Sequence, residues 1–269
     1  MAKKVSICIP VYKNPEGLKK LLESIAIQEY KDFEVIVSDD VNDSGYSSCE
    51  DIALSFLNVM DLKYIKHRST GMPGDNWNSS ISKASGEYIK MMFHDDWFTG
   101  PDSLGKYACL LDNTDAPFAF SGTMQVSSDW RYARHIKEED LKLISQDIRN
   151  IYVGNVVGAP SATIFRNKGI HYDNKLRWLI DMDFYLRQMD ADKAASNTYN
   201  GAEPCNKLPF ANTNEPLVCI GISDSQLTNY CTTHPWLVRR EYLRVGRKYG
   251  LLNNPEYKKY FWSQIKNPH

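Results

Sequence analysis

The chain has 269 residues, 42% of them hydrophobic, and its 32 lysines and arginines nearly balance 33 aspartates and glutamates. This length allows a substantial core in one large α/β domain, and the balanced charge excludes the broad cationic surface that nucleic acids attract. The six cysteines form no C-x-x-C pair, so we expect reduced thiols and no dense disulfide framework. No apolar stretch is long enough for a signal peptide or a membrane span.

In the first hundred residues, short apolar runs alternate with helical patterns, which is typical of βαβ units and a largely parallel sheet. Strands are expected at 5–11, 33–37, 62–65 and 88–93, and helices at about 15–27, at about 47–57 and in a segment that ends near 84. Two acidic pairs, Asp39-Asp40 and Asp95-Asp96, directly follow predicted strands. Open α/β sheets bind ligands at this edge, so both pairs are candidates for a binding site.

The second half is less regular. Strands are expected near 118–126, 161–165 and 217–222, and helices near 138–144, 182–189, 237–249 and 256–265. Residues 194–216 are rich in Asn, Ala, Thr and Pro without periodicity, which indicates either a lid or a disordered loop. No internal repeat and no linker between independent domains is evident.

The usual backbone cradles for phosphate are missing from the sequence. It has neither a Walker-type loop nor the G-x-G-x-x-G pattern, so any phosphate charge must be neutralised in another way. Mg²⁺ or Mn²⁺ held by one or two carboxylates does this well. Asp95-Asp96, before the turn at 99–102, suits that role, while a turn carboxylate or a helix N-cap is the open alternative.

Several segments, in the right order, resemble family 2 glycosyltransferases. The run 5–14 is similar to the opening strand of that family, 35–40 to its second strand with a terminal acidic pair, and 76–96 to the segment that leads into its metal motif. The resemblance implies a GT-A-type α/β fold, in which helices flank a Rossmann-like, mostly parallel central sheet with a smaller C-terminal acceptor-side extension. It also implies a transferase that uses a nucleotide diphosphate sugar, with a UDP-sugar as the expected donor.

The resemblance assigns residues to the donor. It places Pro10, Val11, Tyr12 and Asp39 at the nucleotide base, although Tyr12 has ordinary sheet packing as an equal alternative. It places Asp96 on the metal and Asp95 at the ribose or at metal-bound waters. Asn76 and Asn78 remain as neutral phosphate contacts, because Trp77 stands where many members carry arginine. Phe93 stands where the family often has its first acidic residue, so the fine donor geometry departs from the pattern.

The resemblance also supplies a catalytic base and a further ligand. Asp181 takes the position of the catalytic carboxylate, which would remove the acceptor proton during an inverting displacement; a helix cap is the alternative role. Asp183, two residues along a helix, would point to nearly the opposite side. His234 would complete the metal shell, as a late histidine does in some relatives, and a solvated loop histidine is the competing interpretation.

We therefore expect residues 1–112 to bind the nucleotide sugar, residues 113–236 to bind the acceptor and supply the base, and residues 237–269 to form a helical extension. The expected acceptor is a glycan or lipid-linked molecule in bacterial surface polysaccharide synthesis. The protein is expected to act in the cytoplasm. Peripheral contact with the inner face of the membrane, through Arg239-Arg240 and Lys258-Lys259, is left open, and so is homo-oligomerisation. Two alternatives are a sugar-phosphate nucleotidyltransferase, disfavoured because 10–14 lacks glycine, and an inactive nucleotide-sugar-binding module.

Overall fold

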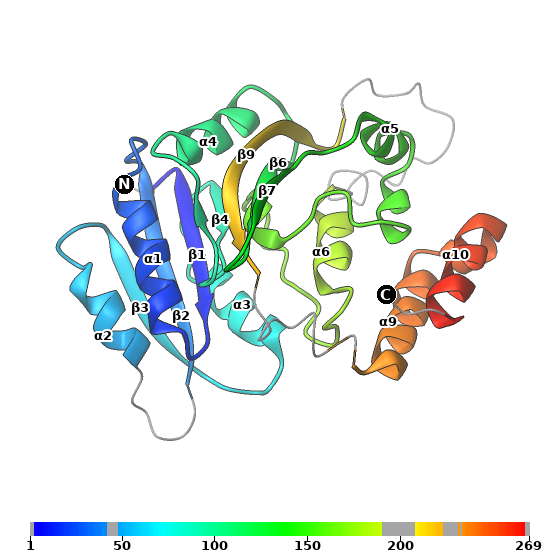
Figure 1. Cartoon of the computed structure of the whole chain (residues 1–269), viewed down its shortest axis with the longest axis horizontal. Helices are drawn as coiled ribbons and strands as arrows, with labels where there is room; N and C mark the ends of the chain where they lie inside the picture. Colours follow the sequence, from blue (N-terminus) through cyan, green and yellow to red (C-terminus); the bar gives the residue numbers. More distant parts are fainter. Residues whose placement is uncertain (1–2, 42–47, 190–207, 223–230, 232, 267–269) are drawn as a thin grey trace.

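A computed structural model describes residues 3–41, 48–189, 208–222, 231 and 233–266. One nine-stranded sheet runs through the middle of the molecule in the order β3-β2-β1-β4-β8-β6-β9-β5, and β7 pairs with β6 outside this path. Helices cover the sheet, and α9 and α10 form the end of the molecule farthest from β1 to β3 (Figure 1).

The N-terminal half follows the predicted alternation of strands and helices. Its elements are β1 (Val5–Val11), α1 (Pro15–Ala26), β2 (Phe33–Val41), α2 (Ser48–Ser55), β3 (Leu62–Arg68), α3 (Pro73–Ile81) and β4 (Tyr88–Met91). Strands β3, β2, β1 and β4 are all parallel, so their carboxyl ends lie at one edge of the sheet. The predicted α/β class and the first βαβ units are confirmed.

The central strand β1 is buried on both faces, as expected for a parallel sheet covered by helices. Val5, Ile7 and Ile9 pack with the apolar side chains of α1 in one hydrophobic cluster, while Cys8 points into a second cluster on the other face. Helix α1 begins at Pro15 behind the N-cap Asn14, whose Oδ1 accepts the Gly17 N–H at 2.9 Å. Two cores on opposite faces therefore hold the sheet edge in place.

The second half adds mainly antiparallel neighbours to the sheet. Strand β8 pairs antiparallel with β4 and β6, and β7 and β5 pair antiparallel with β6 and β9. The elements are β5 (Trp97–Phe98), α4 (Ser103–Asp112), β6 (Phe118–Val126), β7 (Arg131–Arg134), α5 (Glu138–Gln146), η1 (Ile148–Tyr152), η2 (Pro160–Ala162), β8 (Thr163–Arg166), α6 (Ile180–Met189) and β9 (Ala211–Gly221).

Strand β9 is longer than the sequence predicted. A strand was expected only from residue 217, and 211–216 were assigned to a lid or disordered loop, which is wrong for these residues because they pair with β6. The pairing shifts register on both sides of Gly122, where a side chain would overlap the Asn214 carbonyl, so the bulge hides the period-two pattern. Residues 194–207 of the predicted loop lie outside the described residues. Strands β5 and β7 were not predicted.

The chain ends in α9 (Pro235–Lys248), η3 (Leu251–Asn253) and α10 (Pro255–Lys266), close to the predicted helices. Across the described residues, no helix combines the length and the apolar character needed to cross a bilayer. Arg239, Arg240, Lys258 and Lys259 are exposed, so the proposed membrane contact through them stays a prediction.

Candidate active site

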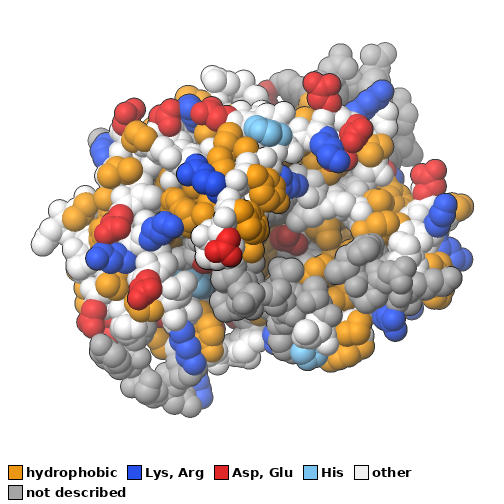
Figure 2. All heavy atoms as spheres, viewed as in Figure 1, with side chains coloured by type: hydrophobic (Ala, Val, Ile, Leu, Met, Phe, Trp, Pro, Cys, Tyr) orange, Lys and Arg blue, Asp and Glu red, His pale blue; other side chains and the backbone are white. Residues whose placement is uncertain are grey.

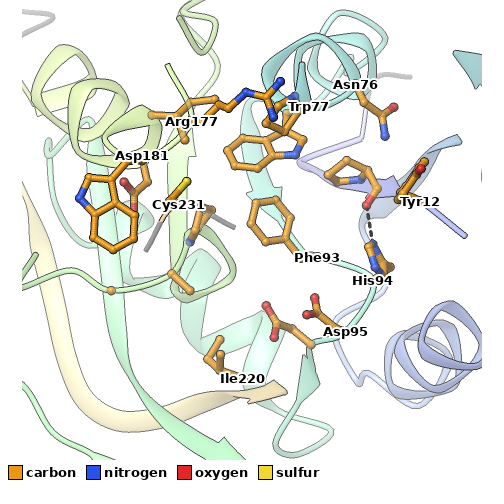
Figure 3. A pocket seen from close by; sticks show the side chains of 18 of the residues that line it. Tyr12, Asn76, Trp77, Phe93, His94, Asp95, Arg177, Asp181, Ile220 and Cys231 are labelled. Carbon is orange, nitrogen blue, oxygen red and sulfur yellow. Dashed lines mark hydrogen bonds between the residues drawn. The ribbon is translucent and has the colours of Figure 1, made fainter. Parts of the chain in front are cut away.

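A cavity of about 940 Å³ opens at the carboxyl edge of the parallel strands, within the size range of small-molecule sites. Pro10, Val11 and Tyr12 line it from the end of β1, and His94, Asp95 and Asp96 line it from the segment after β4. In the view of Figure 3, Tyr12 and His94 lie on one side of the hollow and Asp181 on the other. The cavity therefore joins the two sequence regions in which chemistry was expected.

The two carboxylates of the acidic pair differ in environment. Asp96 is buried, and its Oδ1 accepts the Gly221 N–H at 3.0 Å. Asp95 is partly exposed, and its carboxylate makes no hydrogen bond or ion pair with the described residues. Burial, followed by the negative charge of Asp95, raises the pKa of Asp96 well above its usual range. A bound cation would act in the opposite direction, because positive charge favours the ionised carboxylate.

A buried lysine lies behind the acidic pair. Lys90 in β4 has no exposed surface, and its Nζ donates hydrogen bonds to the carbonyls of Met91, at 3.1 Å, and Ser161. Its ammonium also lies 4.3 Å from the centroid of the Tyr107 ring. Burial lowers the pKa of Lys90, and the negative charge of Asp96 opposes that shift. Burial thus disfavours the charged form of both Lys90 and Asp96, and the opposite charge of each group favours the charged form of the other.

At the end of β2, the structure brings Asp40 rather than Asp39 to the cavity. Asp40 lines it, whereas Asp39 is buried and accepts a hydrogen bond from the Tyr64 hydroxyl at 2.6 Å, so Asp39 does not contribute to the lining. Successive side chains of a strand point to opposite faces, and this alternation separates the two aspartates. The expected contact between Asp39 and the base therefore stays a prediction.

The two asparagines of α3 also separate. Asn76 lines the cavity, donates from Nδ2 to the Val11 carbonyl at 3.1 Å, and keeps a buried Oδ1 without a hydrogen-bond partner among the described residues. Asn78 does not line the cavity, because its amide donates to the Tyr172 carbonyl and accepts the Tyr172 N–H. Asn76 is thus available to a ligand, while the described contacts of Asn78 are structural.

Asp181 lies in the first turn of α6 and lines the cavity. Its carboxylate accepts hydrogen bonds from Asn155 Nδ2 at 2.9 Å and from the Met182 N–H at 2.7 Å. Burial raises the pKa of Asp181 to about 6, with the hydrogen bonds from Met182 and Asn155 opposing the shift. A carboxylate with this pKa is mostly ionised at neutral pH and is a better base than an ordinary aspartate.

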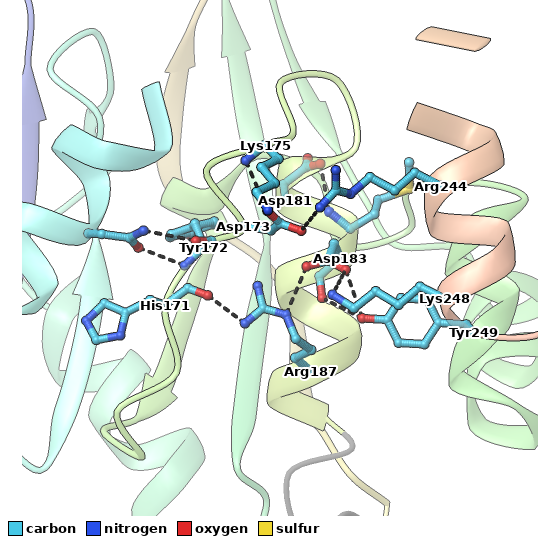
Figure 4. A network of polar contacts seen from close by, with 12 residues as sticks. His171, Tyr172, Asp173, Lys175, Asp181, Asp183, Arg187, Arg244, Lys248 and Tyr249 are labelled. Carbon is cyan, nitrogen blue, oxygen red and sulfur yellow. Dashed lines mark hydrogen bonds and ion pairs between the residues drawn. The ribbon is translucent and has the colours of Figure 1, made fainter. Parts of the chain in front are cut away.

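Asp183 points away from the cavity, as predicted from its spacing on the helix. It is fully buried, and it pairs with Arg187 Nε at 2.9 Å and with Lys248 Nζ at 2.6 Å, while the Tyr249 hydroxyl donates to it at 2.9 Å (Figure 4). These contacts join α6 to α9. The role of Asp183 in the described structure is therefore to hold the helix that carries Asp181.

A second contact from α9 holds the segment just before α6. Glu241 is buried, and its carboxylate accepts the backbone N–H groups of Arg177, Trp178 and Leu179 at 2.9, 2.8 and 3.0 Å. These N–H groups precede the helix, where backbone donors lack partners within the helix itself. Glu241 of α9 thus caps the N-terminus of α6, and no local sequence motif predicted this contact.

His234 does not join the acidic pair in the described structure. It is the N-cap residue of α9 and does not line the cavity; its Nδ1 lies 3.0 Å from Thr233 Oγ1. No group of three or more His, Cys, Asp or Glu side chains within the described residues could hold a metal by itself. The assignment of His234 to a metal shell therefore stays a prediction.

Several lining residues come from the second half and were missed from the sequence. Arg134, at the end of β7, donates from Nη2 to the carbonyls of Asn155 and Val156 at 3.1 and 2.9 Å, while its buried Nη1 has no partner among the described residues. Arg177 lines the cavity and donates to the Gly71 carbonyl at 2.7 Å. Because these residues occur in no motif, only their proximity to Asp181 in the folded chain identifies them.

Comparison with known proteins gives a family match. The family model described as Glycosyl transferase family 2 matches residues 6–174. The chain is 30% identical over 203 residues to an uncharacterized protein of Mycobacterium tuberculosis (strain CDC 1551 / Oshkosh), which covers 69% of this chain and 61% of that protein. It is 35% identical over 196 residues to an uncharacterized glycosyltransferase of Rickettsia prowazekii (strain Madrid E), with 68% and 58% covered. The chain thus spans about three fifths of the length of these relatives.

Two solved structures resemble the fold. The crystal structure of S. aureus TarS 1-349 in complex with UDP-GlcNAc has a TM-score of 0.63 at 20% identity, covering 84% of this chain and 60% of that chain. The mannosyltransferase PcManGT from Pyrobaculum calidifontis in complex with GDP-Man and Mn²⁺ has a TM-score of 0.56 at 13% identity, covering 92% and 65%. At these identities the likeness concerns the fold alone, and it confirms the expected GT-A-type architecture.

Proposed function

This chain belongs to glycosyltransferase family 2, and we propose from its cavity that it transfers a sugar from a nucleotide diphosphate sugar to an acceptor hydroxyl. One observation carries the proposal: the acidic pair Asp95-Asp96 and the carboxylate of Asp181 line the same cavity. A transferase needs charge stabilisation at the leaving diphosphate and a base at the attacking hydroxyl, in one water-poor volume. Both requirements have candidates here.

The donor nucleotide would lie at the end of β1. The ring of Tyr12 is 48% exposed and can cover a base, and the free Oδ1 of Asn76 can accept a hydrogen bond from the donor. Asp40 lines the cavity and is the nearer carboxylate for a base or ribose, with Asp39 as the originally expected one. We take a UDP-sugar as the first candidate, since a similar fold, S. aureus TarS, has been crystallised with UDP-GlcNAc.

A divalent cation, Mn²⁺ or Mg²⁺, fits the acidic pair. Asp95 has a carboxylate without a described partner beside the buried Asp96, and these cations bind through one or two carboxylates while keeping waters and substrate phosphates as further ligands. Asp96 and Asp95 would hold the ion. When bound, it would supply positive charge to stabilise the departing diphosphate.

Asp181 would act as the general base. Its carboxylate would accept the proton of the acceptor hydroxyl as the oxygen attacks the anomeric carbon, which gives inversion in a single displacement. Asn155 and the Met182 N–H hold the carboxylate in orientation. In this proposal, residues 1–112 bind the donor, residues 113–236 bind the acceptor and supply the base, and residues 237–269 form a helical extension, in which Lys248 of α9 pairs with Asp183 of α6. We propose a glycan or lipid-linked acceptor of bacterial surface polysaccharide synthesis, used in the cytoplasm.

The test is release of nucleoside diphosphate from UDP- and GDP-sugars with and without Mn²⁺. We expect UDP release that Asp96→Ala abolishes and that Asp61→Ala, an exposed aspartate at the far edge of the sheet, leaves unchanged. Asp181→Asn should keep the thermal stabilisation by UDP but lower transfer by about 10²- to 10⁴-fold. If no nucleotide sugar raises Tm or releases its diphosphate, the donor site is refuted. Pyrophosphate formed from UTP and a sugar phosphate would indicate a nucleotidyltransferase instead.

A further inference from the structure

Two aromatic rings lie exposed beside strand β7. Trp130 is 46% exposed and Tyr132 is 56% exposed, and their rings stack with centroids 5.4 Å apart and an interplanar angle of 28°. Single exposed apolar side chains are common on protein surfaces, but two large rings held in a stack present a continuous apolar surface to water. We call Trp130 and Tyr132 the aromatic platform.

The aromatic platform continues the wall of the cavity. Tyr132 and Arg134 are two residues apart on β7, so their side chains share one face of the strand, and Arg134 lines the cavity. The sheet register gives the same result independently, because Tyr132 pairs with Gln125 and Gln125 pairs with Ile220, another lining residue. Figure 2 shows hydrophobic side chains gathered over β6 and β7 beside a hollow in the surface.

Polar groups surround the rings. Gln125 lies directly across from Tyr132, and its Nε2 donates to Thr123 Oγ1 at 2.8 Å. The buried Nη1 of Arg134 has no partner among the described residues, and Arg131 is exposed between the two rings in sequence. A ligand on the platform would therefore meet apolar ring surface next to the exposed Arg131, while the buried Nη1 of Arg134 belongs to the cavity wall.

The exposed area of the aromatic platform indicates which kind of ligand it can bind. Large aromatic side chains bury roughly 150–250 Å² each when covered, so two half-exposed rings offer about 200 Å² in total. A stable protein interface needs about 800 Å² from each partner, which is far more. A sugar ring matches this area, with apolar C–H faces for the aromatic rings and hydroxyls for the polar rim.

We propose that the aromatic platform is an acceptor subsite, on which one pyranose ring of an oligosaccharide stacks while the next sugar enters the cavity toward Asp181. The inference rests on the proposed transferase function and deepens it, because it names the acceptor as a saccharide of at least two residues. The continuous face from the platform through Arg134 into the cavity provides the path.

The test is saccharide binding by the full chain with UDP present. A printed array of bacterial oligosaccharides identifies the best-bound probe, which is then titrated in solution against the wild type, Trp130→Ala, Tyr132→Ala and the control Trp262→Ala. Trp262 is 51% exposed on α10 and lies outside the cavity lining. We expect each platform variant to weaken binding by about tenfold, Trp130→Phe to restore part of it, and the control to bind like the wild type.

Melting temperatures of the variants establish that the half-exposed positions tolerate substitution, and Trp130→Phe, which retains a ring, separates loss of stacking from loss of folding. Unchanged saccharide affinity in Trp130→Ala and Tyr132→Ala would overturn the subsite. Failure of the wild type to bind any saccharide on the array would overturn it too. Release of nucleoside diphosphate by the wild type without acceptor tests the transferase function separately. Saccharide binding that depends on the platform, without release from any UDP- or GDP-sugar, would reject the transferase function and leave only a saccharide-binding surface.

Discussion

Replacing Glu241 by alanine should loosen the segment that carries the proposed base. The buried carboxylate accepts three backbone N–H groups just before α6, and Asp181 lies in the first turn of that helix. Alanine keeps the helical propensity of α9 but leaves these donors without their carboxylate. Arg177 and Trp178, whose N–H groups lose their partner, both line the cavity, so the change reaches the site directly.

The expected size of the effect follows from these contacts. At a net stabilisation of about 1 kcal/mol per hydrogen bond, the three bonds contribute about 3 kcal/mol. Burial raises the pKa of Glu241 while the N–H bonds oppose that shift, which shows that desolvation of the carboxylate offsets part of this gain. We therefore expect the free energy of unfolding to fall by about 2 kcal/mol. A displacement of Asp181 by about 1 Å would lower kcat by about 10²-fold.

Urea unfolding measures the first effect, and turnover together with UDP titration measures the second. The matched control is Glu256→Ala, an exposed glutamate on α10, which should stay within about 0.5 kcal/mol of the wild type. UDP affinity should change little in Glu241→Ala, because Pro10 and Val11 lie on β1 and Tyr12 directly follows it. If Glu241→Ala unfolds like Glu256→Ala and turns over like the wild type, the capping role is refuted.

Three further predictions follow from the same geometry. The pKa of Asp181 in the ligand-free protein is raised to about 6 and the base must be ionised, so kcat/KM should fall about tenfold per pH unit below 6, and a kcat/KM profile flat down to pH 5 would exclude Asp181 as the base. Asp183→Ala should lower the free energy of unfolding by about 3 kcal/mol, because it leaves Arg187 and Lys248 without their buried partner; urea unfolding no different from that of Asp61→Ala would contradict this. A side chain at Gly221 would overlap the Asp95 carbonyl, whereas one at Gly105 in α4, outside the cavity lining, would make only an ordinary contact with Tyr30 Cβ at 3.7 Å. Gly221→Ala should therefore lower Mn²⁺-stimulated UDP release by about tenfold or more and Gly105→Ala should not; equal release by both variants would argue against a metal held by Asp95 and Asp96.

Much of the N-terminal half was predictable because its signals are local. The run Val5–Val11 is apolar throughout, as a strand buried on both faces must be, and the amphipathic pattern of the next segment corresponds to α1. Parallel strands bring their carboxyl ends to one edge, so the sequence alone assigns Asp95-Asp96 to a candidate site. The spacing of Asp181 and Asp183 likewise predicted that the two would face opposite ways, which the structure confirms.

The sequence by itself therefore determined the fold class, the candidate binding edge and the candidate acidic residues, since each depends on periodicity within a few residues. Only the tertiary structure decided that Asp40 rather than Asp39 lines the cavity, that Asn78 is occupied by Tyr172, and that Glu241 caps α6 from a distant helix. These outcomes depend on contacts with other segments of the chain: Asp39 contacts Tyr64, 25 residues away, Asn78 contacts Tyr172, 94 residues away, and Glu241 contacts residues 62 to 64 positions away. Side-chain facing at a strand end and long-range capping are set by packing, and no local pattern encodes them.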